Sequence, residues 1–289
     1  MSTELTRVQK IEQTITKKYR RYLWSKFQIA IMEYDMIQPG DKIAVCISGG
    51  KDSMLLAKMM QMYQRWGMAD FQCTFMVMDP GYNAENRAKI EENLKILGID
   101  DAVIFNSDIF AIANNTSDSP CYLCARMRRG ALYNKARELG CNKIALGHHL
   151  NDVIETTVMA MCYSSKLETI IPKSVSKNYG EMSLIRPLYC VKEEDILKWC
   201  RANDLEFIQC ACRFTEKNTG TDHITSKRLE TKNLIKQLKK TNPEVEDNIF
   251  RALHAVQIET FPGYKKDGRM HSFLEDYNAK VKDAENDEN

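Results

Sequence analysis

The chain has 289 residues, of which 44% are hydrophobic and 28% are charged. This composition is ordinary for a globular protein and excludes wholesale disorder, and the length is sufficient to bury a complete α/β core. The formal net charge of +2 excludes a uniformly polycationic protein, so any nucleic-acid binding would have to come from local basic patches.

The N-terminal segment is polar and lacks the apolar core of a signal peptide. No apolar run approaches the roughly 20 residues needed to span a bilayer, so we expect a cytoplasmic protein that does not contact membranes. Residues 4–34 are predicted to form one amphipathic helix, and we assign residues 1–34 to this element. Its basic cluster is equally compatible with an RNA contact and with a solvated helix face; the cluster comprises Lys17, Lys18, Arg20 and Arg21.

Short apolar runs then alternate with helical patterns. We expect strands at 42–47, 71–78, 102–105 and 143–147, and helices at 54–66, 85–97, 123–139 and 152–163. This alternation predicts an α/β fold with a doubly wound parallel sheet, covered by helices on both faces. Ligands of such sheets bind at the carboxyl ends of the strands, so the segments after Ile47 and Leu146 should share one edge.

The remainder of the chain is predicted to be mostly helical. Helices are expected at 193–202, 224–240 and 245–258, followed by a polar, frayed tail at 281–289. We therefore divide the rest of the chain into a main domain at 35–215, which carries the candidate sites, and a C-terminal helical extension with its tail at 216–289.

The strongest motif is S-G-G-K-D-S at residues 48–53, between an expected strand and an expected helix. Glycines let the backbone approach a phosphate, and successive N–H groups at a helix N-terminus form an anion cradle. Hydroxyl groups can add donors, Lys51 can neutralise phosphate charge, and Asp52 is a candidate for helping to hold Mg²⁺. The motif matches neither the Walker A loop nor G-x-G-x-x-G.

Ten cysteines are unusual for a chain of this expected location, where disulfides are rare. Cys121 and Cys124 form a C-x-x-C that opens a predicted helix, and the helix dipole favours their thiolates. Cys210 and Cys212 follow much later, and spacing alone slightly favours a structural zinc site over an iron–sulfur centre. The other six are interpreted as ordinary buried residues: Cys46, Cys73, Cys141, Cys162, Cys190 and Cys200.

The motif at 48–53 resembles the signature of the PP-loop ATP-pyrophosphatases. The chain also has C-Y-L-C-A-R-M-R-R-G-A-L-Y, then G-H-H-x-x-D, then I-R-P-L, then the later cysteines. Their order and approximate spacing resemble those of the tRNA 2-thiocytidine synthetases, over roughly residues 42–212. The resemblance implies that ATP is cleaved between its α- and β-phosphates and that O2 of a cytidine in the tRNA anticodon loop is adenylated and then replaced by sulfur.

The resemblance also implies roles for individual residues. Asp152 stands where the family places a catalytic acidic residue, whereas Asn151 replaces a family aspartate. The arginines are argued from position instead: Arg126, Arg128 and Arg129 follow the C-x-x-C on one helix and could bind tRNA phosphates or the substrate nucleotide, with a solvated basic helix as the alternative. Arg128 or Arg129 is favoured because each lies about one turn past Cys124, and Arg128 is our candidate with Asp152 and Asp52 for a catalytic role. The expected nucleotide-binding residues are Ser48, Gly49, Gly50, Lys51, Asp52, Ser53, Gly147 and His148.

In the family, three cysteines hold a [4Fe–4S] cluster and leave one iron open for sulfur. The matching residues are Cys121, Cys124 and Cys212, with Cys210 in reserve because this chain has C-x-C where the family has C-x-x-C. The related 2-thiouridine branch has a lysine near Arg128 and extra terminal zinc-finger cysteines. This chain has neither, which favours the thiocytidine side.

The expected cofactors are therefore ATP, Mg²⁺ and a [4Fe–4S] cluster. The expected partners are tRNA and a sulfur donor, either a persulfide carrier or inorganic sulfide, with a homodimer as an option. Two alternatives stay open. One is a PP-loop enzyme that thiolates or otherwise modifies another tRNA base, and the other is a zinc-stabilised nucleotide- or RNA-binding module without catalysis.

Overall fold

A computed structural model of the protein describes residues 4–107, 109, 120–176, 178–180, 182–208, 227–275, 277 and 278, with the backbone alone for 120–125. The chain divides into two compact units, residues 1–234 and residues 235–289, which are described separately. Within the described ranges, no helix combines the length and the apolar character needed to cross a membrane.

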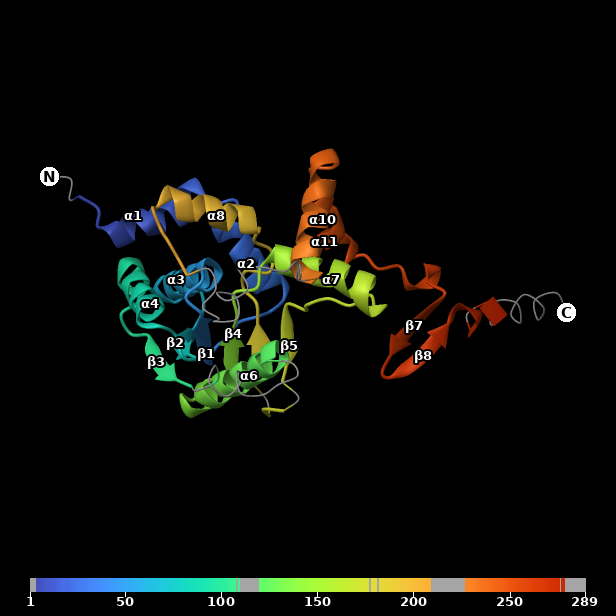
Figure 1. The fold of residues 1–289 in the computed structure, drawn as a ribbon, viewed down its shortest axis with the longest axis horizontal. Helices are drawn as coiled ribbons and strands as arrows, with labels where there is room; N and C mark the ends of the chain where they lie inside the picture. The colour runs from blue at the N-terminus through green and yellow to red at the C-terminus, as the bar shows by residue number, and fades with distance from the viewer. Residues whose placement is uncertain are drawn as a thin grey trace. The chain divides into compact units, whose positions relative to one another are not determined.

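The first unit is built on a six-stranded sheet with the order β3-β2-β1-β4-β6-β5 (Figure 1). Five of its strands pair in parallel, and β5 at one edge pairs antiparallel with β6. The predicted parallel sheet is therefore confirmed. The strands are β1 Asp41–Ile47, β2 Phe71–Asp79, β3 Val103–Asn106, β4 Lys143–Ala145, β5 Lys173–Val175 and β6 Ser183–Ile185.

Helices cover both faces of this sheet, and Figure 1 shows α6 on the face opposite α3 and α4. Ala44 and Cys46 of β1 pack with Tyr133 and Ala136 of α6, so the alternate residues of β1 face the other layer. The doubly wound arrangement follows from this two-sided burial. The helices are α3 Lys51–Arg65, α4 Ala84–Leu97, α6 Pro120–Glu138, α7 Leu150–Ser164 and α8 Glu193–Ala202.

The N-terminal segment differs from the single helix expected over residues 4–34. It forms α1 Arg7–Gln13, a π-helix at Thr14–Lys18, a turn, and α2 Trp24–Glu33. The Thr14 hydroxyl donates to the carbonyl oxygen of Ile11 at 2.6 Å, and Thr16 donates to that of Glu12 at 2.9 Å. Such bonds from threonine to the preceding turn compete with the regular helical pattern and explain the interruption.

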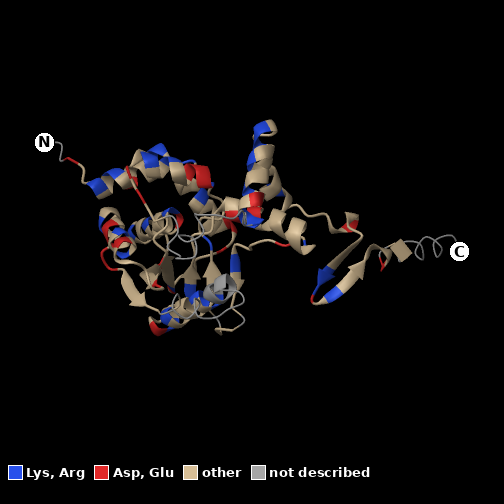
Figure 2. Cartoon of the chain, in the orientation of Figure 1, with Lys and Arg blue, Asp and Glu red and all other residues tan. Residues whose placement is uncertain are grey.

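The basic cluster of this segment is exposed, and Figure 2 shows the concentration of lysine and arginine along the N-terminal helices. On α2, Trp24 and Phe27 are buried, with ring centroids 5.6 Å apart, and the Phe27 ring lies 5.6 Å from the ring of Tyr63 on α3. The apolar face of the segment therefore holds it against the sheet domain and leaves its basic face in solvent.

The second unit begins within α10 Lys227–Thr241 and continues with α11 Val245–Ala252. The helix expected over residues 245–258 therefore ends early. An unexpected hairpin follows, β7 Gly263–Lys266 and β8 Arg269–Ser272. Asp267 and Gly268 have φ values of 50° and 81°, as a two-residue hairpin turn requires. The Asp-Gly pair was the sequence signal for this hairpin.

A buried ion pair connects the starts of β1 and β4. The carboxylate of Asp41 pairs with Lys143 and also accepts hydrogen bonds from the Gln38 backbone N–H at 2.6 Å and from Asn142 at 2.8 Å. Burial acts to raise the pKa of Asp41, but the hydrogen bonds from Lys143, Gln38 and Asn142 outweigh it and lower the pKa below its ordinary value. Removing either side chain would destabilise the fold, because the other charge would stay buried without a partner.

We expect Asp41→Asn to lower the free energy of unfolding at pH 7 by about 3 kcal/mol, because it leaves Lys143 buried without its counter-ion. The stabilisation is complete above the ordinary aspartate pKa and is lost as pH falls through the depressed one, so the difference from wild type should shrink in acid. Urea unfolding measures both. Glu168→Gln is the control, because its pair with Lys166 is exposed. Equal losses in the two variants would contradict the analysis.

Candidate functional site

Two loops meet at the carboxyl edge of the sheet, one after β1 and one after the neighbouring strand β4. A Cβ atom on Gly147 would lie 3.0 Å from the backbone nitrogen of Ser53 and 3.1 Å from the carbonyl carbon of Asp52. Any side chain there would force the backbone of Asp52 and Ser53 to shift by a few tenths of an ångström, since neither contact is with a flexible side chain. The structure thus brings the S-G-G-K-D-S and G-H-H motifs together, as their positions after two adjacent strands predicted.

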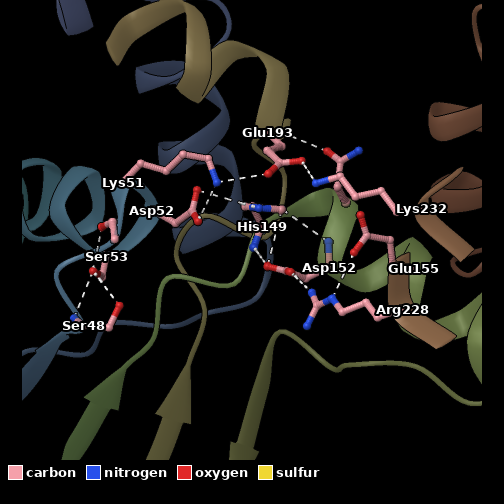
Figure 3. A network of polar contacts seen from close by, with 12 residues as sticks. Ser48, Lys51, Asp52, Ser53, His149, Asp152, Glu155, Glu193, Arg228 and Lys232 are labelled. Carbon is pink, nitrogen blue, oxygen red and sulfur yellow. Dashed lines mark hydrogen bonds and ion pairs between the residues drawn. The ribbon is translucent and has the colours of Figure 1, made fainter. Parts of the chain in front are cut away.

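The first loop is held in a defined conformation. Gly49 has a φ of 83°, which favours glycine, and Gly50 precedes α3 without a side-chain cap. The Ser53 hydroxyl donates to the Gly50 carbonyl at 2.9 Å and accepts from the Ser48 backbone N–H at 3.0 Å (Figure 3). The uncapped N–H groups at the start of α3 therefore remain available to an anion.

A cavity of about 650 Å³ lies beside this loop. Residues of the loop line the cavity. Three arginines also line it: Arg128, Arg129 and Arg186. Such a volume accommodates a nucleotide-sized ligand. Of the residues predicted for the site, the cavity lining includes Ser48, Gly50, Asp52, Ser53, Arg128, Arg129, Gly147 and His148.

Lys51 lies at the edge of this site between two carboxylates. Its ammonium is 3.1 Å from Asp52 Oδ2 and 3.0 Å from Glu193 Oε1 (Figure 3). Burial acts to lower the pKa of Lys51, but the charges of Asp52 and Glu193 outweigh it and raise the pKa above its ordinary value. Glu193 was not predicted from the sequence, because it belongs to α8 and meets Lys51 only through the fold.

The second carboxylate oxygen of Asp52 has a different environment. Oδ1 is buried and makes no hydrogen bond to any residue in the described part of the chain, and the Nε2 atom of His149 lies 3.8 Å away. A carboxylate oxygen without a donor is the kind of ligand that Mg²⁺ takes together with phosphate oxygens. Asp52 therefore suits the role that the sequence suggested for it.

Asp152 is engaged at the start of α7. One of its oxygens accepts the backbone N–H of His149 at 2.9 Å, in a capping box, and the other pairs with Arg228 of α10. Arg228 also lies 3.2 Å from Glu155. Asp152 is not among the residues that line the cavity, so a direct contact with a ligand there would require it to leave Arg228.

Asn151, which replaces a family aspartate, has a defined contact. Its side-chain oxygen accepts the backbone N–H of Glu193 at 2.9 Å, at the first residue of α8. An asparagine can therefore satisfy one of the unpaired N–H groups at the start of that helix without adding a negative charge beside Glu193. This contact connects the segment that follows the G-H-H motif to α8.

His148 and Arg186 are half-buried and line the cavity. Burial, followed by the charge of Arg186, lowers the pKa of His148 to about 4, so its imidazole is neutral at pH 7. Burial also lowers the pKa of Arg186 to about 10, which leaves the guanidinium charged. His148 Nδ1 and Arg186 Nε find no hydrogen-bond partner within the described ranges. The sequence singled out His148, whereas Arg186 appeared only as part of a motif.

The cysteine predictions are tested in part. Cys121 and Cys124 belong to the first turn of α6, but their side chains lie outside the described part, as do Cys210 and Cys212 entirely. No group of three or more histidine, cysteine or acidic side chains among the described residues is arranged to hold a metal. Of the six remaining cysteines, four are buried and Cys73 is half-buried, whereas Cys162 is exposed, which corrects its interpretation as a buried residue.

Comparisons with known proteins agree with the fold and the loop. A family model described as a PP-loop domain matches residues 15–216, and the chain belongs to this family. It is 34% identical to the tRNA-cytidine(32) 2-sulfurtransferase of Geobacter metallireducens, over 83% of this chain and 91% of the relative. It is 33% identical to the protein of the same description from Methylobacillus flagellatus, over 93% of this chain and 85% of the relative.

A solved structure has the same fold. It is the U34-tRNA thiolase NcsA from Methanococcus maripaludis with its [4Fe-4S] cluster, which superposes with a TM-score of 0.64. The alignment covers 82% of this chain and 80% of that chain at 20% sequence identity. At this level of identity, the likeness establishes the architecture of the sheet domain.

We expect Gly147→Ala to lower the free energy of unfolding by about 1–3 kcal/mol, because the added methyl group would overpack against the backbone of Asp52 and Ser53. Urea unfolding provides the measurement. Gly50→Ala is the matched control, since its Cβ would be 3.7 Å from Ser48 Oγ, an ordinary contact, and an alanine at the N-cap should cost under about 1 kcal/mol. Similar losses in both variants would count against the close approach of the two loops.

Proposed function

We propose that this protein is an ATP-dependent tRNA sulfurtransferase, which adenylates a cytidine in the anticodon loop and replaces its 2-oxygen with sulfur. The observation that carries the proposal is the cavity in which the PP-loop motif and the G-H-H motif meet a wall containing Arg128, Arg129 and Arg186. The identity of 33–34% with tRNA-cytidine(32) 2-sulfurtransferases over most of the chain supports the choice of substrate.

ATP suits the loop at residues 48–53. The N–H groups at the start of α3 are suitable donors for the leaving pyrophosphate. The hydroxyl groups of Ser48 and Ser53 would join them by turning from their present acceptors, Ser53 Oγ and the Gly50 carbonyl. Asp52 would hold Mg²⁺ through its unpartnered oxygen, and the ion would offset the charge that develops on the pyrophosphate. Lys51 would add a positive charge on the same side.

The base would be activated by bond exchange at the α-phosphorus. O2 of the cytidine attacks it, the bond to the pyrophosphate breaks, and the base becomes an O-adenylate. This adenylation converts a poor leaving group, an oxide, into a good one. Hydrosulfide then attacks C2 of the ring, the bond from C2 to the former O2 breaks, AMP departs with that oxygen, and loss of the sulfur-bound proton leaves the thiocarbonyl without any change of oxidation state. Neutral His148 can hydrogen-bond the base or the adenylate without adding charge, and the arginines can bind tRNA or nucleotide phosphates.

Asp152 has two candidate roles in this scheme, as a ligand of Mg²⁺ or as an acceptor of a proton when the base is activated. Each role requires Asp152 to give up its partner Arg228, because that pair occupies one carboxylate oxygen. Arg128 is proposed to position the substrate nucleotide, since it lines the cavity and carries a fixed positive charge.

The sulfur-carrying centre is proposed to be a [4Fe–4S] cluster bound by Cys121, Cys124 and Cys212. When bound, such a cluster supplies an iron that can carry hydrosulfide to the activated base. Cys124 and Arg128 are one helical turn apart on α6. The proposed cluster ligands Cys121 and Cys124 and the cavity residue Arg128 therefore belong to the same helix. The partners are proposed to be tRNA and a persulfide carrier or sulfide, in the cytoplasm.

We expect the purified protein, given ATP, Mg²⁺, unmodified tRNA and sulfide, to form AMP, pyrophosphate and 2-thiocytidine in tRNA. Asp52→Ala and Ser53→Ala should each lower the rate by about 100-fold or more, because each removes an interaction with the reacting phosphates. Chromatography of nucleotides and mass spectrometry of tRNA nucleosides provide the measurements. ADP and phosphate as the main products would contradict the PP-loop chemistry, and turnover without thiolation would favour a different base modification.

Anaerobically prepared protein should contain about four irons per chain, as one [4Fe–4S] cluster requires. Cys121→Ala, Cys124→Ala and Cys212→Ala should each lose the iron and the visible absorption, whereas Cys210→Ala should keep them. Metal analysis and absorption spectra check this result independently of activity. A colourless protein with one tightly bound zinc would instead favour the non-catalytic alternative, and the exposed Cys162 offers a control, since Cys162→Ala should leave the iron content unchanged.

A further inference from the structure

Glu193 is a carboxylate shared by two lysines from different parts of the chain. Its Oε1 atom lies 3.0 Å from the ammonium of Lys51 in the phosphate loop, and its Oε2 atom lies 2.6 Å from that of Lys232 on α10 (Figure 3). The three residues lie on three different elements, α3, α8 and α10. Glu193 therefore connects the nucleotide-binding loop to a helix that does not line the cavity.

The position of Glu193 is fixed. Its side chain is only 17% exposed, it occupies the first residue of α8, and its backbone N–H donates to Asn151. Burial acts to raise its pKa, but Lys232 and Lys51 outweigh that effect and lower the pKa to about 2. The carboxylate is thus ionised at neutral pH, and it adds a negative charge beside the loop.

This negative charge opposes the binding of an anion. Lys51 can neutralise a phosphate only to the extent that its ammonium is not committed to Asp52 and Glu193. Lys232 has the opposite effect, because it satisfies the other oxygen of Glu193 and offsets its charge. Lys232 is 47% exposed and has no cavity contact, so its influence on a bound nucleotide would pass through Glu193.

We propose that Glu193 is a positioning residue for the phosphate-loop lysine, and that Lys232 of α10 sets how strongly Glu193 holds Lys51. In the empty loop Glu193 keeps Lys51 in place, and on nucleotide binding Lys51 turns to the phosphates while Lys232 remains as the counter-ion of Glu193. The inference rests on the proposed binding of ATP to the loop, and it adds α10 to the elements that control that binding.

Two variants of the same ion pair should then change ATP affinity in opposite directions. Glu193→Gln frees Lys51 and should lower the Kd for ATP by about threefold, the size of one partly exposed ion pair, while kcat falls because Lys51 is no longer positioned. Lys232→Met leaves Glu193 to Lys51 alone and should raise the Kd by a similar factor. Titration of the full chain with a non-hydrolysable fluorescent ATP analogue measures Kd, and pyrophosphate release measures kcat.

The double variant Glu193→Gln with Lys232→Met distinguishes an effect of Lys232 that passes through Glu193 from a general effect of its charge on ATP binding. If Lys232 acts through Glu193, then Lys232→Met should change the Kd by less than about 1.5-fold in the Glu193→Gln background. Additive effects, or shifts of the same sign in the two single variants, would overturn the inference. Lys198→Ala is the control, because Lys198 is also on α8 but pairs with Asp195 and Glu194, and it should leave the Kd unchanged.

A failure of the proposed ATP binding would be recognised separately, because the wild-type chain would then not bind the ATP analogue. Should Glu193→Gln fold poorly by urea unfolding, Glu193→Asp supplies the test. It keeps the charge but shortens the side chain by one methylene group, and it should shift Kd and kcat in the same directions by smaller factors. An increase in Kd for Glu193→Asp would overturn the inference as well.

Discussion

The backbone contact between Gly147 and the start of α3 is the constraint on which the site depends. It exists because β1 and β4 are neighbours in the sheet and both end at the same edge. This contact places His148 in the cavity with the phosphate loop and sets His149 within 3.8 Å of Asp52. The capping box of α7 then fixes Asp152 one turn away. The lack of a side chain at Gly147 thus allows two motifs that lie far apart in the sequence to pack closely.

The parts of the fold that could be predicted from the sequence are those with a long apolar run or a clear amphipathic pattern. β1 and β2 were found from their apolar runs, and the bounds of α8 were predicted to the residue from its amphipathic pattern. β5 and β6 were missed because they have three residues each and include polar ones, which is too short a pattern; β4 has the same length but was found because its apolar run continues to Leu146. The interruption at Thr14–Lys18 was missed because the apolar pattern continues through it and only hydroxyl contacts reveal the break.

The same distinction holds for the site. The loop and the G-H-H motif are contiguous in sequence, so their chemistry could be recognised without a structure. Glu193, Arg228 and Lys232 were missed, because each functions through an ion pair with a residue distant in the chain; Lys51 and Glu193, for example, are 142 positions apart. Acidic and basic residues on exposed helices give no sequence signal that separates such pairs from ordinary surface charges.

The positive charges around the site fall into two groups, those paired with carboxylates near the loop and those on the cavity wall. Near the loop, Lys51, Lys232 and Arg228 are each paired with carboxylates, so that side is close to neutral before a ligand arrives. On the cavity wall, Arg128, Arg129 and Arg186 form no ion pair with any described residue. An anionic ligand therefore gains attraction at the wall directly, whereas at the loop it must exchange existing pairs. Affinity for the nucleotide would then depend on α8 and α10, and affinity for other phosphates on α6.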